Sequence, residues 1–423
     1  MITIGALFFV FGFVTWVNSV LIPYFKLTCN LTVKEAMLVA FAFYISYFVM
    51  AFPSSFILKK TGYKNGMMIG LFVMAAGALI FIPAASTRAY AIFLLGLFVE
   101  ATGLTLLQTA ANPYVTILGP IESAASRISI MGVCNKVAGA IAPLLLVGAI
   151  VKNPNEIDQV KAQLTTMSVS QQNVVLDELS GRLVIPYLVI AAVLIGLGLI
   201  IRFTHLPDIH DEDVGEGQPA NAATSSKGLL QHRHLVFGAI AIFCGVSVEV
   251  LAVDSIINYA QYTGLSFREA KYFATYTLLI MIVSYLIGIF TIPKIITQRK
   301  ALQLSAIIGL LFTALAIFIK GDLSVWFVAL LGLGNALLWP SIWPLSLEGL
   351  GRQTSKGSAL LIMGVVGGAV SPLIYGVISD ATNPREAYWI LIPFYLFILY
   401  FSEAGYKIKK RDPRPAVAPV QTM

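Results

Sequence analysis

The sequence predicts an all-α membrane protein with 12 transmembrane helices in two six-helix halves and both termini in the cytoplasm. The first observation behind this prediction is composition: of 423 residues, 58% are hydrophobic and 12% are charged. An average soluble domain has about 25% charged residues, so this chain has too few to cover a water-exposed surface. The second is a mean hydropathy of +0.83. Together they exclude a soluble enzyme and a DNA-binding protein.

The third observation is a series of twelve apolar runs, each near the length of about 20 residues that a spanning helix needs. Two polar stretches, 152–182 and 204–234, interrupt the series. The second is rich in acidic residues, Gly, Ser and Ala, which is typical of a flexible linker. The runs occupy residues 2–25, 36–58, 66–85, 90–118, 128–151, 183–203, 235–261, 270–293, 301–319, 323–347, 357–379 and 386–405.

This spacing divides the chain into four predicted segments. They are an N-terminal six-helix bundle over 1–203, a cytoplasmic linker over 204–234, a C-terminal six-helix bundle over 235–406 and a cytoplasmic tail over 407–423. Because the first apolar run follows Met1 without a basic leader, we expect no cleavable signal peptide.

The distribution of Lys and Arg predicts the orientation. With a cytoplasmic N-terminus, 17 of the 28 basic residues fall in inner loops and the tail, 10 fall in outer loops, and Lys136 lies inside a span. An excess of basic residues on the inner side is the usual topology signal. This placement explains the net charge of +7 without a nucleic-acid partner. The three cysteines have no paired spacing, so neither a disulfide framework nor a metal site is indicated, and we expect no cofactor.

The second half of the chain repeats motifs of the first. Residues 137–145 read VAGAIAPLL and residues 366–374 read VGGAVSPLI, an offset of 229. Arg127 and Lys356 differ by the same 229, and Pro113 and Pro340 by 227. Two parallel repeats describe transporters in which two bundles rock about a site near the middle of the membrane.

Four ionisable residues lie deep in the predicted spans: Glu100, Lys136, Glu249 and Asp254. Charges in hydrocarbon are costly, so each is expected to face a cavity or a partner. All four histidines lie in or beside the linker, which excludes a histidine relay through the membrane. The sequence has no HExxH, GxSxG or Walker motif, so a membrane hydrolase or an ATP-driven pump has no chemistry available, and we expect no enzymatic activity.

Amides and aromatic rings in helices 1 and 4 are candidates for contacting a sugar. Gln108 and Asn112 share one helix face with Thr105, and amides both donate and accept hydrogen bonds with hydroxyl groups. The alternative is that they bridge helices. In helix 1, Asn18 is the main polar group, and Trp16 offers either a stacking face for a pyranose or an interfacial anchor.

Helices 5, 7 and 10 supply the remaining candidates. Lys136 either extends toward the cytoplasm or pairs with Glu249 or Asp254, and Asn135 beside it is a candidate sugar contact. Asp254 and Asn258 belong to a polar stripe on helix 7 that predicts a water-lined face, together with Ser247 and Gln261. Glu249 lies about 140° around the helix from Asp254, so it is either the partner of Lys136 or a cation switch. Trp339 and Trp343, four residues apart on helix 10, form either a sugar platform or lipid-facing packing.

Three motifs resemble one family. LQTAANPYVTILGP in helix 4, WVNSVLIPYF in helix 1 and GVCNKVAGAIAP in helix 5 are similar to the fucose–galactose–hexose symporters of the major facilitator superfamily, closest to the branch of glucose/galactose and N-acetylglucosamine transporters. The resemblance covers nearly the whole chain. It implies the major facilitator fold, a bacterial cytoplasmic (inner) membrane, and import of a neutral hexose or N-acetylhexosamine by alternating access with a coupled cation.

The sequence departs from the fucose–proton symporters of that family at two positions. These symporters carry an acidic residue after the helix 1 Asn and a Glu in helix 4, where this chain has Ser19 and Gln108. Neither side chain can carry a proton. The coupling candidates that remain, for Na⁺ or H⁺, are Glu249, Asp254 and Glu100.

Two rival functions stay open at this point. Lys136 can act as a fixed cation, which would make the protein an uncoupled uniporter. A drug or metabolite exporter on the same fold is the other alternative. The partners expected are a sugar and the lipid bilayer, and the chain is expected to be a monomer. The substrate candidates are Trp16, Asn18, Gln108, Asn112, Asn135, Asp254, Asn258, Trp339 and Trp343, and the coupling or ion-pair candidates are Lys136, Glu249, Asp254 and Glu100.

Overall fold

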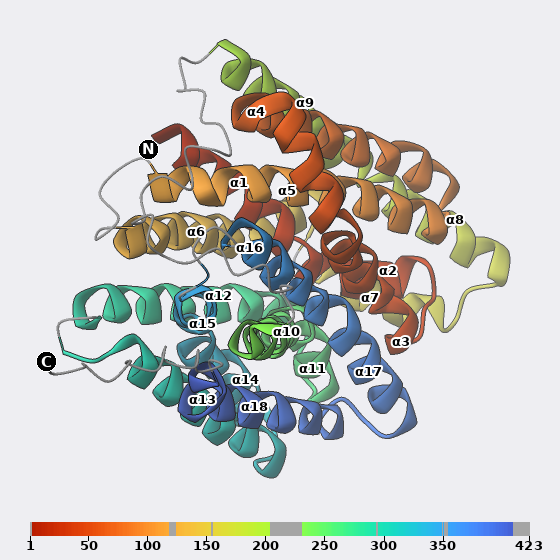
Figure 1. Cartoon of the computed structure of the whole chain (residues 1–423). Coiled ribbons are helices and arrows are strands. Elements are labelled where there is room, and N and C mark those ends of the chain that lie inside the picture. The colour runs from red at the N-terminus through yellow and green to blue at the C-terminus, as the bar shows by residue number, and fades with distance from the viewer. Residues whose placement is uncertain are drawn as a thin grey trace, which may run out of the picture.

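The structure is a computed structural model, and it describes residues 2–117, 124–153, 155–203, 231–292, 295–348, 350 and 354–408. Regular elements in these residues are all helical. Most of the predicted linker and of the predicted tail lies outside them. In Figure 1 the helices up to α9 fill the upper part of the molecule, and those from α10 onward fill the lower part.

The first group of helices contains nine elements. They are α1 (Ile2–Trp16), α2 (Asn18–Thr28), α3 (Val33–Ala36), α4 (Leu38–Thr87), α5 (Tyr90–Ile117), α6 (Ala124–Ile150), α7 (Glu156–Leu164), α8 (Val169–Gly181) and α9 (Val184–Phe203).

The second group begins after the linker. It contains α10 (Arg233–Asp254), α11 (Ile256–Tyr262), α12 (Phe267–Thr291), α13 (Gln298–Phe318), α14 (Asp322–Asn335), α15 (Leu338–Leu347), α16 (Thr354–Met363), α17 (Gly367–Ala381) and α18 (Leu391–Glu403), with short 3₁₀ turns at η4 (Gly364–Val366), η5 (Glu386–Ile390) and η6 (Gly405–Lys407).

The described residues contain 11 helices long and apolar enough to cross a membrane, against twelve predicted. The difference lies in one of them, Val33–Thr87, which has 55 residues. A helix of that length would run about 80 Å, far more than the hydrocarbon core of about 30 Å. Gly62, at φ 74° and ψ 167°, interrupts it. Only glycine adopts this conformation without strain, so the segment bends at Gly62 and supplies two spans.

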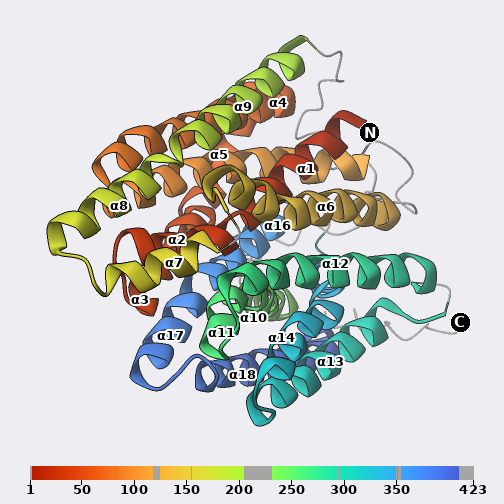
Figure 2. The same cartoon turned by 180° about the vertical axis from the view of Figure 1, so that it is seen from behind.

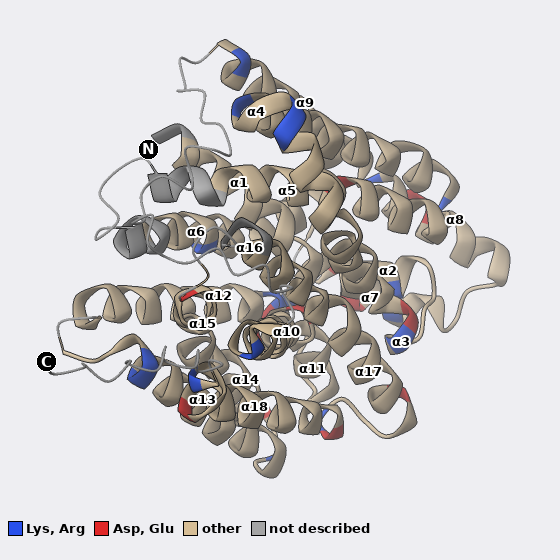
Figure 3. Cartoon of the chain, viewed as in Figure 1, with Lys and Arg blue, Asp and Glu red and all other residues tan. Residues whose placement is uncertain are grey.

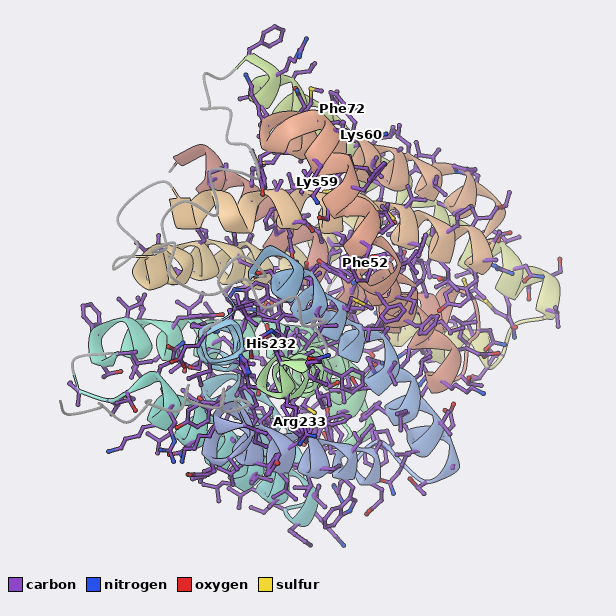
Figure 4. All side chains as sticks on the ribbon, in the orientation of Figure 1. Phe52, Lys59, Lys60, Phe72, His232 and Arg233 are labelled. Atoms are coloured by element: carbon purple, nitrogen blue, oxygen red, sulfur yellow. The ribbon has the colours of Figure 1, made fainter. Side chains whose placement is uncertain are left out.

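The bend at Gly62 is basic. Lys59 and Lys60 are exposed, and Figure 4 labels both on the bend of α4. Figure 3 shows further Lys and Arg on the side of the molecule where both termini lie, at the ends of α9 and α13. The opposite side carries α3, α7 and α8 (Figure 1). We call the side of the termini inner and the other side outer, in keeping with the predicted orientation.

The polar stretch 152–182, an outer loop in the sequence, forms the two helices α7 and α8. Ser168 and Gln171 make a capping box at the start of α8, in which each side chain bonds the other residue's backbone. Such a box satisfies N–H groups that the first helical turn leaves without partners. The signal was therefore present in the sequence as a Ser followed three residues later by a Gln.

The main contacts between the two halves are made by α4 and α6 of the first half. α6 packs against α12, and α4 packs against α16 and α17, an arrangement that Figures 1 and 2 show from opposite sides. The hydroxyl of Thr275 on α12 donates to the backbone carbonyl of Ala140 on α6 at 2.9 Å. A site between the halves is therefore bounded by α4, α6, α12 and α17.

Two aspartates join the halves at the outer side. Asp380, at the end of α17, accepts hydrogen bonds from the backbone N–H groups of Val33 at 3.1 Å and Lys34 at 2.8 Å. Asp158 of α7 accepts from the backbone N–H of Phe267 at 3.1 Å and 3.3 Å, through its two oxygens. We call these two contacts the outer latches.

The outer latches have the same design in both halves. In each, a carboxylate from one half lies at the N-terminus of a helix from the other half, α3 or α12, where backbone N–H groups and the helix dipole favour a negative charge. Each helix also carries its own capping box, Thr32 with Glu35 and Ser266 with Glu269. The backbone hydrogen bond from Thr32 holds the pKa of the Glu35 carboxyl below its usual value.

Removing both outer latches is expected to open the outer side. Losing a carboxylate at a helix N-terminus costs about 0.5–2 kcal/mol, so Asp158→Ala with Asp380→Ala should raise outer exposure about tenfold. The measurement is the rate at which a membrane-impermeant maleimide labels a single cysteine placed at Gln261, in a background without the native cysteines. Asp177→Ala, an exposed outer change within the first half, is the control. Equal labelling rates in all variants would contradict the latch.

Candidate functional site

The centre of the interface between the halves holds a buried ion pair. Lys136 of α6 donates to Glu249 of α10, with side-chain exposures of 6% and 16%. Of the partners left open for Lys136 by the sequence, the structure therefore shows Glu249. The Lys136 ammonium also lies 4.1 Å from the ring centroid of Trp16. The positive charge is thus held between a carboxylate and an aromatic face.

The ring of Trp16 is occupied by contacts within the protein and has no face open to a ligand. Its ring is 3% exposed, its indole N–H donates to Asn135 Oδ1 at 3.3 Å, and Gly139 lies directly against it, since a Cβ there would come within 2.2 Å of the ring. In this state the ring and Asn135 orient each other and support Lys136. Both candidates lie beside the interface, but neither presents a free polar or stacking surface here.

Three of the candidate site residues are buried without hydrogen-bond partners among the described residues. Both side-chain atoms of Asn18, both carboxylate oxygens of Asp254 and the Nδ2 of Asn258 accept or donate no bond. Buried polar groups are almost always paired in folded proteins, so unpaired ones at one location indicate groups available to a ligand. The hydroxyl of Tyr44 on α4 is a fourth such group.

These unpaired groups coincide with interruptions of the spanning helices. α1 and α2 are separated at Val17, directly before Asn18, and α10 and α11 are separated at Ser255, directly after Asp254. α2 packs against both α10 and α11. Interrupted helices that meet near the middle of the membrane are where secondary transporters bind substrates and coupling ions.

Gln108 of α5 is linked to the interface through tyrosines. Its side chain lies near the hydroxyl of Tyr47, and the ring of Tyr47 stacks on Tyr44 with centroids 6.2 Å apart. Tyr44 in turn packs against Gly368 of α17, where a Cβ would lie 2.7 Å from the ring. The side chain of Asn112 lies outside the described residues.

Trp339 and Trp343 of α15 stack on each other with centroids 5.0 Å apart and an interplanar angle of 27°. Trp339 and Glu249 line a small cavity of about 10 Å³ together with Ile242, Gly245, Val246 and Ile342. That volume holds about one water molecule, so this cavity is too small for a sugar. Trp339 therefore lies beside Glu249 of the ion pair.

Glu100 lies away from this interface. It is 2% exposed, and its backbone packs against Gly77 of α4, where a Cβ would come within 2.3 Å of the Glu100 nitrogen. It lies near Tyr187 of α9. α4, α5 and α9 all belong to the first half, so the structure places Glu100 inside one bundle rather than between two.

An outer pocket of about 370 Å³ reaches Asn258, one of the residues with an unpaired side-chain atom. Its walls come from both halves and include Asn258, so it connects the outer side with the stripe of α10 and α11. Burial lowers the pKa of Lys161 on its wall, an effect that nearby Asp158 opposes. The lining residues are Lys26, Val33, Lys161, Asn258, Gln261, Tyr262, Ser379 and Pro384.

Sequence reasoning missed the tyrosines of this site. Tyr44 and Tyr47 are three residues apart and so share a face of α4. Tyr285 of α12 packs near Gly132 of α6, where a Cβ would lie 3.3 Å from the ring. Two tyrosines at helical spacing within an apolar span were the available signal, because a buried hydroxyl needs a partner. Among the described residues, no group of three metal-binding side chains gathers.

Comparison with known proteins gives consistent results. The family model of the Major Facilitator Superfamily matches residues 4–366. A glucose/galactose transporter of Brucella abortus biovar 1 (strain 9-941) is 35% identical over 404 residues, covering 95% of this chain and 92% of the relative. The L-fucose-proton symporter of Escherichia coli (strain K12) is 30% identical over 410 residues, covering 95% and 91%.

Solved structures agree with these sequence relatives. A crystal structure of the E. coli fucose:proton symporter superposes with a TM-score of 0.72 at 27% identity, covering 95% of this chain and 97% of that one. The fold class predicted from the sequence is therefore confirmed, as is an integral membrane protein of the bacterial inner-membrane type. This chain belongs to the major facilitator superfamily, within its family of fucose, glucose and galactose transporters.

Proposed function

We propose that this protein imports a neutral monosaccharide, a hexose or an N-acetylhexosamine, by alternating access and with a coupled cation. The observation that carries the proposal is a set of buried, unpaired polar groups on helices of the two halves that pack against each other: Asn18 on α2, Asp254 on α10 and Asn258 on α11. Sugar hydroxyls are both donors and acceptors and so match amides such as Asn18 and Asn258. The sugar relatives named above support the same class of substrate.

The proposed sugar site combines the two halves. Asn18 and Gln108 come from the first half and Asn258 from the second, so rocking of the halves would bring them together or separate them. A movement of the two halves would bring further groups to the sugar. We keep in the proposal the amides of Asn112 and Asn135 and the rings of Trp16, Trp339 and Trp343. Because one chain supplies both sides of the site, we expect the transporter to act as a monomer.

An uncoupled uniporter is disfavoured by one contact. A fixed ammonium can replace a coupling cation only if its positive charge is not already neutralised by another carboxylate. The charge of Lys136 is neutralised by Glu249. Coupled and uncoupled transport differ in uptake by proteoliposomes of labelled glucose, galactose, fucose and N-acetylglucosamine under imposed Na⁺ or proton gradients. Accumulation of a sugar above its equilibrium concentration supports coupled transport. Equilibration of the sugar without accumulation would favour the uniporter. No uptake of any of these sugars would favour an exporter of other compounds.

Replacing Gln108 with Ala is expected to weaken sugar binding by about tenfold or more, because a sugar hydroxyl left without its hydrogen-bond partner in the site costs about 1–3 kcal/mol. The change also removes the amide that lies near the Tyr47 hydroxyl. Binding is measured as sugar affinity of the purified protein in detergent. Gln163→Ala, on the exposed face of α7, should bind as the parent does. Normal affinity in Gln108→Ala would remove α5 from the proposed site.

A further inference from the structure

Asp254 is a carboxylate without a partner in the interior of the interface. Its exposure is 1%, and neither oxygen accepts a hydrogen bond from any described residue. A buried ion without a partner costs several kcal/mol, so the site is stable only when a cation or a proton neutralises the carboxylate. Lys136, the basic residue deep in the spans, is paired with Glu249 instead.

The position of Asp254 links it to both halves and to the outer side. It ends α10 at the interruption before Ser255, and Asn258, one turn further on, lines the outer pocket. Tyr44 of α4, in the other half, lies near enough to interact with it electrostatically. A group placed there changes its surroundings whenever the halves move, which is what a coupling group requires.

The same surroundings favour a proton over a metal cation. A hard metal cation needs a shell of several oxygen ligands, among which carboxylates neutralise its charge, and Asp254 belongs to no group of three His, Cys, Asp or Glu side chains among the described residues. A proton needs only the carboxylate oxygen itself. The neutral acid then donates one hydrogen bond and accepts others, which suits the amides and the hydroxyl around it.

We propose that Asp254 binds the proton that drives sugar uptake, a role that rests on the proposed function. One Oδ takes a proton from the outer aqueous side. With the sugar bound and Asp254 neutral, the protein changes from outward-facing to inward-facing, and the proton then leaves to the cytoplasm. The O–H bond is the only bond formed and broken. The coupling group therefore lies in the second half, in place of the acidic positions occupied here by Ser19 and Gln108.

The other titratable groups near Asp254 do not offer an equal alternative. Tyr44 faces it from α4, and Tyr388 bonds the hydroxyl of the adjoining Ser255 at 2.8 Å. Glu249 is the other carboxylate on the same helix and is held by Lys136. The remaining groups are phenols beside Glu249 and two lysines of the outer pocket: Tyr285, Tyr395, Lys26 and Lys161.

The test compares the parent protein with Asp254→Asn in two measurements. The parent should accumulate sugar under a proton gradient, and its sugar affinity should fall as pH rises, by at most about tenfold per pH unit for one linked proton. Asp254→Asn should lose proton-driven accumulation and show a sugar affinity independent of pH. Asp322→Asn, the same change on the exposed start of α14, should behave as the parent does.

Each remaining result decides the matter. Proton-driven accumulation in Asp254→Asn, a pH-dependent affinity in that variant, or accumulation by the parent under a Na⁺ gradient alone would overturn the role of Asp254 while leaving sugar transport in place. No sugar uptake by the parent would overturn both proposals. If Asp254→Asn does not fold, Asp254→Glu keeps a titratable carboxyl and should retain pH dependence; a folded glutamate variant with a pH-independent affinity would overturn the inference.

Discussion

Lys136→Met is expected to destabilise the folded protein by about 3–5 kcal/mol, because removing one member of a buried pair leaves the other charge without a partner. Glu249, at 16% side-chain exposure, would keep its carboxylate beside a cavity with room for about one water molecule. The change also removes the cation from the face of Trp16. The measurement is thermal or chemical unfolding of the purified protein in detergent.

Two further variants isolate the pair. Lys152→Met makes the same substitution in an exposed ion pair with Glu178, at 67% and 59% exposure, where solvent screens the charges and little change in stability is expected. Combining Lys136→Met with Glu249→Gln should recover part of the loss, since the unpaired charge is then gone. A double variant no more stable than Lys136→Met alone would show that the loss comes from packing.

Gly12→Ala is the second change for which a large effect is expected. A Cβ at Gly12 would lie 1.8 Å from the backbone oxygen of Asn135, so α1 and α6 would have to separate. Overpacking typically costs about 1–3 kcal/mol, and a backbone atom in contact cannot rotate away as a side chain can. We expect a loss near the upper end of that range, together with a changed position of Asn135 and Lys136. Unfolding and sugar affinity are the two measurements.

Gly148→Ala is the matched control on α6. Nothing lies within 4 Å of a Cβ at Gly148, and alanine in an exposed helical position is favoured over glycine by about 1 kcal/mol. The control is therefore expected to be unchanged or slightly more stable. Parental stability in Gly12→Ala would mean that the two helices have freedom to move apart at this point.

The sequence predicted the architecture because the bilayer leaves few alternatives. An apolar run of a given length must be a spanning helix, and the positions of Lys and Arg indicate which side each loop occupies. The segment around Gly62 shows what the sequence does and does not reveal. Basic residues and an interrupted apolar run predicted two spans, whereas the positive φ that makes the bend is seen only in the structure. The helices α7 and α8 were missed because their capping signals are short and their composition is polar.

The site was only partly predictable for a geometric reason. Helical spacing tells which residues of one helix share a face, and it placed Asp254 and Asn258 together. It does not tell how far one helix is displaced along another, so Lys136 had two possible partners until the helices were placed. The contacts of Tyr44 with Gly368 and of Asp380 with α3 arise between segments more than 300 positions apart, and no local pattern contains that information.

The outer latches act as a bivalent connection. When one of them separates, the other still holds the halves close, so the broken contact re-forms at a high effective concentration rather than by a free search. Lasting opening then requires both to be broken at once, which makes opening steep rather than gradual. A transporter joined in this way spends little time partly open at its outer side, and a solute without a path through the full cycle has little opportunity to leak past it.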